Sequence, residues 1–256
     1  MGKNEVSAVV ITLNEEKNIS RSLGGLQWVD EIIVADTGST DNTIEEARRY
    51  TDKIYSIPWE GFGDAYNRAT AFAEKEWIFF IHADEEMTPE LEDEITSLLS
   101  NGNILSDGYY IARRPNFLGY WIKHSGWYPS YEMRLFRKNK GKCNDRIVHQ
   151  DVDIDGKKDY LKNHLNHYTD PTMEIYLDKM NRFTTMASQE LYDKNRKCYV
   201  LDLLFRPPAV FFKMFITKAG FLDGFPGFLA ALFSSLHVFV KYLKLRRLWK
   251  DNPGDS

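Results

Sequence analysis

The 256-residue sequence lacks several features that define well-known protein classes. Its two cysteines, Cys143 and Cys198, are too few for a disulfide framework and argue against a thiolate metal site. No apolar signal segment precedes the first strand-like run, which argues against secretion. No G-x-G-x-x-G motif follows that run, which disfavours a nicotinamide-dependent oxidoreductase.

The charge that is present is unevenly distributed. The chain has a formal net charge of −4, yet residues 194–250 hold eleven Lys and Arg against two Asp. No basic stripe crosses the acidic body, so a nucleic-acid partner is not expected. An acidic body with a basic, apolar tail is typical of a catalytic head that contacts an anionic membrane surface. We therefore expect a cytoplasmic protein, peripheral on the inner face of the cytoplasmic membrane.

Apolar runs alternate with helical patterns through the first hundred residues. We expect buried strands at 6–13, 31–35, 53–57 and 77–81, and helices at 43–50, 64–75 and 89–100. This alternation predicts an α/β fold with a mostly parallel sheet covered on both faces. The segment 107–168 is richer in strand-like and aromatic residues. We expect one domain over 1–170, with halves at 1–100 and 101–170, and a helical extension over 171–256.

Polar clusters follow three of these strands directly. They are Asn14–Glu15, Asp36–Asp41 and His82–Glu86. In parallel sheets, ligands bind beyond the carboxyl ends of the strands. The three clusters therefore predict one binding site at one edge of the sheet.

The third cluster, H-A-D-E-E, has the residues needed for a divalent cation. Mg²⁺ and Mn²⁺ bind hard oxygen ligands, with one or two carboxylates and the phosphate oxygens of a substrate. Asp84 is the best candidate ligand, with Glu85 behind it. The alternative is a helix start, where acidic residues are favoured by the helix dipole.

The remaining candidates have equally simple alternatives. Asp36 suits a turn or helix cap as well as a contact to a nucleobase, and Asn14 and Glu15 suit a helix start. Arg68 is either a phosphate clamp or a solvated charge. His149 is a possible metal ligand or a structural histidine. Trp127 and Tyr128, in G-W-Y-P, form either a platform for a sugar or part of a core.

The motifs together resemble a known family. The runs V-V-I-T-L-N-E-E, E-I-I-V-A-D-T-G-S-T-D-N-T, G-F-G-D-A-Y-N-R-A and W-I-F-F-I-H-A-D-E resemble the family-two glycosyltransferases of GT-A fold, which is Rossmann-like. The later runs H-S-G-W-Y-P, R-L-F-R, V-H-Q, L-N-H-Y and G-F-L-D-G resemble those of bacterial lipopolysaccharide core β-1,4-glucosyltransferases and their relatives. The resemblance covers nearly the whole chain.

The resemblance implies roles for particular residues. His82-Ala83-Asp84 stands at the family's D-x-D, whose first residue contacts the ribose and whose last acid binds the metal. The expected nucleotide contacts are Thr12, Asn14, Glu15, Asp36, Ser39, Arg68 and His82. The expected metal ligands are Asp84 and His149, the metal being Mg²⁺ or Mn²⁺. Transfer from a UDP-hexose to a glycolipid or oligosaccharide would invert the anomeric carbon, with a carboxylate as base.

The chain departs from the family pattern at three positions. His82 stands where an aspartate is usual, Gln150 where the relatives read V-H-E, and Ser130 where an acid is common. Glutamine cannot act as a base. The remaining candidates are Glu85, Asp145 and Asp151, and we name Glu85 and Asp151. The departures also raise an alternative function, a sugar-nucleotide-binding scaffold or regulatory protein with impaired catalysis.

The tail contains an uncharged run at 224–240, interrupted early by Pro226-Gly227. Seventeen residues are marginal for a membrane span. We expect an interfacial or buried helix, with attachment through 207–248 and with Lys241, Lys244, Arg246 and Arg247 facing anionic head groups.

Overall fold

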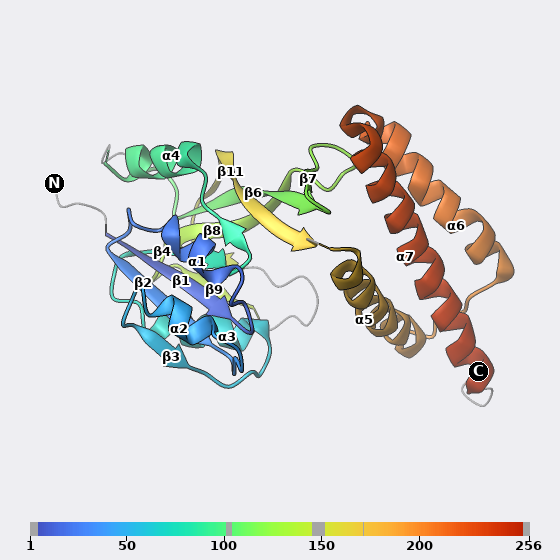
Figure 1. Cartoon of the computed structure of the whole chain (residues 1–256), viewed down its shortest axis with the longest axis horizontal. Helices are drawn as coiled ribbons and strands as arrows, with labels where there is room; N and C mark the ends of the chain where they lie inside the picture. Colours follow the sequence, from blue (N-terminus) through green and yellow to red (C-terminus); the bar gives the residue numbers. More distant parts are fainter. Residues whose placement is uncertain (1–4, 101–103, 145–151, 171, 253–256) are drawn as a thin grey trace. The chain divides into compact units, whose positions relative to one another are not determined.

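The computed structural model describes residues 5–100, 104–144, 152–170 and 172–252 (Figure 1). They form two compact units. The first contains residues 1–113 and 130–167, and the second contains 114–129 and 168–256. The stretch 114–129, which we expected in the 101–170 half of one domain, is thus grouped with the C-terminal helices.

The first unit begins with a parallel sheet in the order β3-β2-β1-β4. The strands are β1 (Val6–Thr12), β2 (Glu31–Asp36), β3 (Ile54–Ser56) and β4 (Trp77–His82). The helices between and after them are α1 (Ile19–Gly24), α2 (Thr43–Ala47), α3 (Phe62–Ala71) and α4 (Pro89–Ser100). The predicted α/β alternation is therefore present, and α2 ends earlier than the sequence pattern indicates.

Beyond β4 the sheet becomes antiparallel. Its order continues β8-β6-β11-β5, with β7 paired to β6, and β9 and β10 form a separate hairpin. The bounds are β5 (Glu85–Glu86), β6 (Gly108–Phe117), β7 (Tyr120–Trp121), β8 (Ser130–Arg137), β9 (Gly141–Cys143), β10 (Val152–Ile154) and β11 (Lys158–Asp170). Strands β5 and β11 pair through Glu85 and His167, which brings the turn after β4 next to the end of β11.

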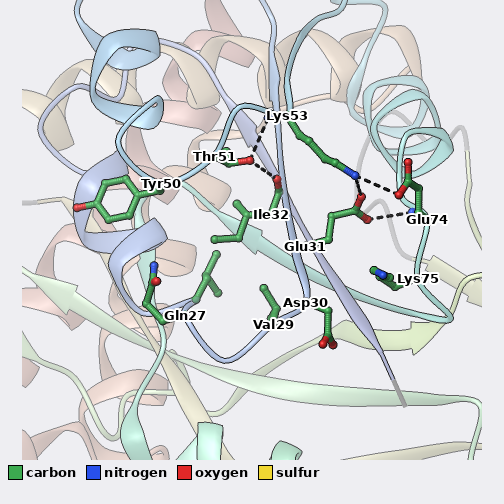
Figure 2. Close-up of a pocket in the computed structure, with 11 residues that line it drawn as sticks. Gln27, Val29, Asp30, Glu31, Ile32, Tyr50, Thr51, Lys53, Glu74 and Lys75 are labelled. Atoms are coloured by element: carbon green, nitrogen blue, oxygen red, sulfur yellow. Dashed lines mark hydrogen bonds and ion pairs between the residues drawn. The ribbon is translucent and has the colours of Figure 1, made fainter. Parts of the chain in front are cut away.

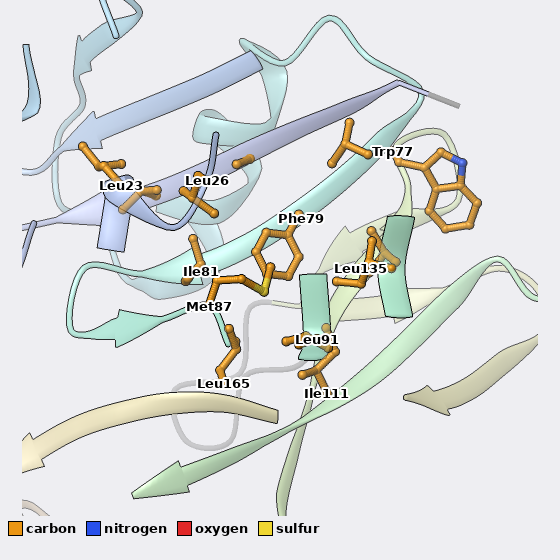
Figure 3. Close-up of a cluster of buried hydrophobic side chains, with 14 of the residues drawn as sticks. Leu23, Leu26, Trp77, Phe79, Ile81, Met87, Leu91, Ile111, Leu135 and Leu165 are labelled. Carbon is orange, nitrogen blue, oxygen red and sulfur yellow. The ribbon is translucent and has the colours of Figure 1, made fainter. Parts of the chain in front are cut away.

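Alternation along the strands fills two cores, one on each face of the sheet. Trp77, Phe79 and Ile81 of β4 point to the face covered by α1, α2 and α4 (Figure 3). Ile78 and Phe80 point to the other face, where α3 and the β9–β10 hairpin cover them. Because β4 is buried on both faces, its register is fixed and the residues that follow it are held in place.

The second unit is built from three long helices, α5 (Met173–Asp193), α6 (Val200–Phe212) and α7 (Gly224–Asp251). A π-helical turn, η1 (Lys213–Thr217), and a 3-10 turn, η2 (Gly220–Asp223), connect α6 to α7. Pro207 and Pro208, where the expected membrane attachment begins, lie inside α6. A small apolar cluster around Phe117, Ile122 and Tyr176 packs against Ala230 and Phe233 of α7.

Within the described residues, Gly220–Asp251 is long and apolar enough to cross a membrane, judged by length and composition only. The mean hydropathy of its most apolar stretch is 1.4, and 22% of that stretch is buried.

The turn between α6 and α7 depends on a close backbone approach. A Cβ atom at Gly227 would lie 1.9 Å from the carbonyl oxygen of Gly220. The carbonyl oxygen belongs to the main chain, and the position of a Cβ atom is fixed by the main chain, so neither atom can move away by changing a rotamer. We expect Gly227→Ala to lower the free energy of unfolding by about 2 kcal/mol or more, measured by urea denaturation. Gly24→Ala is the matched control, because its nearest atom lies 3.9 Å away. Equal stabilities of the two variants would contradict the argument.

Candidate active site

The three polar clusters meet at one edge of the sheet. The β1–β2 register sets Thr12 beside Asp36, and the β1–β4 register sets Ile11 beside His82. The residues that follow β1, β2 and β4 therefore lie next to one another beyond the carboxyl ends of parallel strands.

Asn14 connects the first two loops. Its φ of 54° is left-handed, a conformation that asparagine tolerates better than most residues. Its backbone N–H donates to the Ser39 hydroxyl at 2.9 Å, and its side-chain oxygen accepts from the Thr40 N–H at 2.8 Å. The loops after β1 and β2 therefore form one hydrogen-bonded unit.

Asp36 is buried and is engaged by its own loop. Its carboxylate accepts from the N–H groups of Gly38 and Ser39 at 3.0 Å each, and from the Ser39 hydroxyl at 2.5 Å. This is the turn that the sequence suggested as the alternative to a nucleobase contact. Any contact from Asp36 to a ligand must coexist with these bonds.

Thr12 and Glu15 differ in how their side chains are used. Glu15 begins the turn before α1, where its N–H donates to the Thr43 hydroxyl at 2.7 Å and its carboxylate accepts from Asn18 at 2.7 Å. The Thr12 hydroxyl is buried and has no hydrogen-bond partner among the described residues. Buried polar atoms are rarely left unsatisfied, so Thr12 is the better candidate for a ligand contact.

His82 is fixed by its main chain and by both ring nitrogens. Its N–H donates to Glu85 at 2.9 Å, and its carbonyl accepts from the Ser22 hydroxyl at 3.1 Å. The Nε2 atom is hydrogen-bonded to the Tyr66 hydroxyl, and Nδ1 lies 3.4 Å from Nη2 of Arg134. Because a guanidinium can only donate, Nδ1 is the acceptor, which assigns the ring proton to Nε2.

The charge state of this cluster follows from burial and Arg134. Burial and the positive charge of Arg134 lower the pKa of His82 to about 4, so the imidazole is neutral at pH 7. Burial also raises the pKa of Tyr66, which keeps the phenol protonated. The contact expected between His82 and a ribose must therefore come from a neutral ring that already has two protein partners.

Glu85 lies at the centre of a buried ion-pair network. Its side chain is fully buried, and its carboxylate lies 2.6 Å from Arg134 and 3.5 Å from Arg113. Glu132 pairs with both arginines. Burial opposes the charge on Glu85, but Arg134 outweighs it and holds the pKa of Glu85 well below its usual range. A carboxylate that is inaccessible and weakly basic is poorly suited to be the base that we expected.

Asp84 meets a partner that the sequence-based site did not include. Its Oδ2 lies 3.3 Å from Nε2 of His167, and both side chains remain partly accessible, at 23% and 15%. Burial raises the pKa of Asp84, but the hydrogen bond from His167 outweighs this, so the pKa is lowered overall. His167 belongs to the L-N-H-Y run, and only the pairing of β11 with β5 shows that it meets Asp84.

The Asp84–His167 pair fits a divalent cation held mainly by its substrate. Asp and His are both ligands of Mn²⁺-type ions, and Mg²⁺ and Mn²⁺ sites in nucleotide enzymes commonly use few protein ligands. The described residues contain no group of three or more His, Cys, Asp or Glu side chains that could hold a metal ion. Phosphate oxygens and water would have to supply the other positions.

Other expected site residues are in different settings. Arg68 pairs with Asp64 at 2.5 Å and with Glu60 at 2.8 Å, as the solvated-charge alternative requires. Trp127 packs edge-to-face on Phe117, with ring centroids 5.2 Å apart, which fits the core alternative. Tyr128 is half-buried beside it. Asp145, His149, Gln150 and Asp151 lie outside the described residues.

A separate pocket of about 400 Å³ lies at the start of β2, away from this edge (Figure 2). Its buried Glu31 is paired with Lys53 and accepts from the Glu74 N–H at 2.9 Å. Burial opposes the charge on Glu31, but these hydrogen bonds outweigh it and lower its pKa. The charged side chain of Glu31 thus holds the start of β2 to the segments that contain Lys53 and Glu74.

Comparison with known proteins identifies the class. The model of the family described as Glycosyl transferase family 2 matches residues 7–152, more than half of the chain. The chain belongs to this family and is a glycosyltransferase, and its sheet and flanking helices have the GT-A arrangement.

Two curated relatives are similar to this chain over nearly its full length. The chain is 26% identical to the lipopolysaccharide core biosynthesis glycosyltransferase LpsC of Rhizobium meliloti, covering 98% of this chain and 96% of that protein. It is 28% identical to an uncharacterized glycosyltransferase of Rickettsia felis, covering 94% and 89%.

Solved structures with a related arrangement include S. aureus TarS, at 15% identity and a TM-score of 0.46, which covers 97% of this chain and 92% of that one. Glucosyl-3-phosphoglycerate synthase from Mycobacterium tuberculosis is 25% identical, with a TM-score of 0.37 and 44% of each chain covered. Both TM-scores are below 0.5, so the class rests on the family match and not on these structures.

The ion pair beneath the site gives a stability prediction. Arg134→Met removes the closest cation from fully buried Glu85, and we expect a loss of about 3–5 kcal/mol in the free energy of unfolding. Adding Glu85→Gln to that variant should restore part of the loss, because the buried charge is then removed. Lys140→Ala is the control, since it breaks only an exposed pair with Asp155. Chemical denaturation of the four proteins is the measurement, and a stable Arg134→Met variant would contradict the prediction.

Proposed function

We propose that the protein is an inverting, metal-dependent hexosyltransferase that uses a UDP-hexose and an acceptor of the lipopolysaccharide-core type. The observation that carries the proposal is the pairing of Asp84 with His167 beside the loops after β1 and β2. A metal ligand pair next to nucleotide-binding loops is what a sugar-nucleotide donor with a diphosphate leaving group requires.

Asp84 and His167 would hold the divalent cation, Mg²⁺ or Mn²⁺. When bound, the cation neutralises the negative charge that develops on the diphosphate as the glycosidic bond breaks. Asp84 is suited to this role because its lowered pKa keeps it ionised at neutral pH. His149, which we also expected as a ligand, remains a candidate for a further position.

The nucleotide would lie along the loops after β1 and β2. Thr12, whose hydroxyl has no partner among the described residues, is the strongest contact. Asn14, Glu15, Asp36 and Ser39 form the hydrogen-bonded frame around it. Arg68 and His82 stay in the proposed set as weaker members. His82 acts in this proposal chiefly as a rigid neutral spacer that orients the turn holding Asp84.

Inversion at the anomeric carbon needs a base for the acceptor hydroxyl. Glu85 is inaccessible and ion-paired, so we assign it a positioning role and propose Asp151 as the base. Trp127 and Tyr128 remain candidates for the acceptor. The full-length similarity to a lipopolysaccharide core biosynthesis glycosyltransferase supports a lipid-linked acceptor. We place the enzyme on the cytoplasmic side of the membrane, attached peripherally by its C-terminal helices.

The metal assignment can be tested with labelled UDP-hexoses and a core-truncated lipopolysaccharide acceptor. We expect Asp84→Asn and His167→Ala each to lower Mn²⁺-dependent transfer by about 100-fold or more, because several kcal/mol of charge stabilisation are lost. Asp159→Asn, an exposed acid on the same strand as His167, should retain full transfer. Wild-type rates in Asp84→Asn would overturn the metal assignment.

A second function, a donor-binding scaffold without turnover, is favoured by one observation. His82 stands at the first position of the expected D-x-D, and both of its ring nitrogens already have protein partners. The scaffold would bind UDP in a calorimeter yet give no product with any acceptor extract. The enzyme would show both binding and turnover, so the two measurements made on one sample separate the functions.

A further inference from the structure

The C-terminal hairpin has an exposed apolar face that the packing of the second unit does not use. On α7, large apolar side chains with 37–67% exposure recur every three or four residues, so they form one stripe along the helix. The members of this stripe are Phe225, Phe228, Leu232, Leu236, Phe239 and Leu243.

Helix α6 and the turn after it have a second stripe of the same kind. Its members are Leu201, Leu204, Phe205, Phe212 and Ile216, with 56–67% exposure. The polar residues of α6 lie on another side, where Asp202 pairs with Arg206 at 2.5 Å. Each helix therefore has one exposed apolar side and one side used for packing.

The two helices run antiparallel, side by side (Figure 1). The Ser235 hydroxyl donates to the Pro207 carbonyl at 2.8 Å, and the Arg206 guanidinium lies 4.9 Å from the centre of the Tyr242 ring. At 3.6 residues per turn, the α7 stripe lies about a quarter of a turn, and the α6 stripe about two-fifths of a turn, past the side that faces the other helix, in the same rotational sense. For antiparallel helices, offsets in the same rotational sense turn both stripes toward one side of the hairpin.

Ring contacts connect the α7 stripe to α6 and the turn after it. Phe228, at the edge of the α7 stripe, lies 5.7 Å from Phe211 and 6.0 Å from Phe215, and Phe211 lies 5.7 Å from Phe212 of the α6 stripe. We call this combined surface the hairpin face, defined by the eleven stripe residues named above. A surface with this many large exposed apolar side chains is unusual for a protein without a partner.

Helix α5 covers a different side of α7 along much of its length. Tyr176 contacts Phe233 with ring centroids 5.2 Å apart, and Tyr192 contacts Trp249 at 4.5 Å. Between them, Lys244 donates to the Asn181 carbonyl at 2.7 Å and to the Thr184 hydroxyl at 2.9 Å. Lys244 is thus a link to α5, and our expectation that it faces lipid head groups is not supported.

This packing argues against α7 as a membrane span. Charged residues of α5 are exposed close to these contacts, among them Glu174, Asp178 and Arg182. A spanning α7 would carry them into the hydrocarbon, where ionised side chains are strongly disfavoured. An in-plane α7 leaves α5 in water and gives the stripe an apolar environment.

The exposed charges of the hairpin indicate what kind of surface its apolar face binds. Arg246, Arg247 and Lys250 are exposed at the end of α7, and Lys213 and Lys218 are exposed around the connecting turn. The acids of this region are each paired, as in the contact of Asp223 with His124 at 2.8 Å. Cations at both ends of an apolar stripe complement anionic head groups around an acyl layer.

We propose that the hairpin face inserts into one leaflet of an anionic membrane, with α6 and α7 parallel to the bilayer plane. This inference specifies the peripheral attachment included in the proposed function and rests on it, but it requires neither the metal nor the donor. The partner is the lipid surface itself.

Environment-sensitive fluorophores can measure the depth of each position. A single cysteine is placed at Phe225, Leu232 or Phe239 in a Cys198→Ser background, since Cys143 is buried. With phosphatidylglycerol vesicles, all three positions should shift to an apolar environment at one common depth, and Asp178→Cys should stay in water. A graded depth from Phe225 to Phe239 would show a span, and a change that needs no lipid but depends on protein concentration would show a second copy. Either result overturns the proposal.

A variant pair tests the face itself by vesicle flotation. Phe225→Ser/Leu232→Ser/Phe239→Ser should bind anionic vesicles at least about 100-fold more weakly than the wild type. Ile175→Ser/Leu177→Ser/Phe183→Ser is the matched control, because it removes three exposed apolar side chains of α5 and should bind normally. Equal binding by the two variants would overturn the proposal. Calorimetric UDP binding of each variant reports separately on the donor site, so failure of the proposed function is distinguishable.

Discussion

The buried ion pair between Glu85 and Arg134 is the interaction on which the site depends. It joins the turn after β4 to β8, a strand that reaches the sheet only after a long excursion of the chain. Because both side chains are fully buried, the pair stabilises the fold only while its geometry is kept, since either partner alone would be an uncompensated charge. The same carboxylate accepts from the His82 N–H, so the turn that presents Asp84 has little freedom. Rigidity at this turn is therefore a consequence of a buried ion pair with a distant strand rather than of the loop's sequence alone.

This constraint changes how the substitution at His82 should be understood. An aspartate there would add a second carboxylate within the surroundings of Glu85, and the two negative charges would share Arg134. A neutral histidine avoids that repulsion, and Tyr66 and Arg134 satisfy its ring. The residue is thus compatible with the network around it, whatever it contributes to a ligand. Burial disfavours the charged form of the ring, and the nearby cation Arg134 opposes protonation as well. The ring therefore stays uncharged.

Local patterns were sufficient to predict most of the first unit. The apolar runs at β1, β2 and β4 are buried strands because a sheet covered on both faces needs continuous hydrophobic residues, and the polar residues at their ends meet as the parallel register requires. The partners of those residues could not be predicted in the same way. His167 reaches Asp84, 83 residues earlier, only through an antiparallel pairing, and Arg134 reaches Glu85 across 49 residues. Neither distance leaves a periodic signal in the sequence. The preference for Glu85 as base had the same origin, since exposure cannot be read from the neighbours of a residue.

The C-terminal helix illustrates a different limit of sequence reasoning. Hydropathy averaged along α7 describes how much apolar surface it has, but not which sides are already covered. Alanines and glycines such as Gly227, Ala230 and Ala231 face the packed side, where small residues allow close approach, and the six residues of the α7 stripe remain exposed. A helix with a continuous stripe of exposed large apolar side chains differs from a core helix, which buries such side chains. It also differs from an isolated span, because charged α5 is fastened along it. An environment that is apolar on one side and aqueous on the other satisfies both sides of α7, and the proposed leaflet of a bilayer is such an environment.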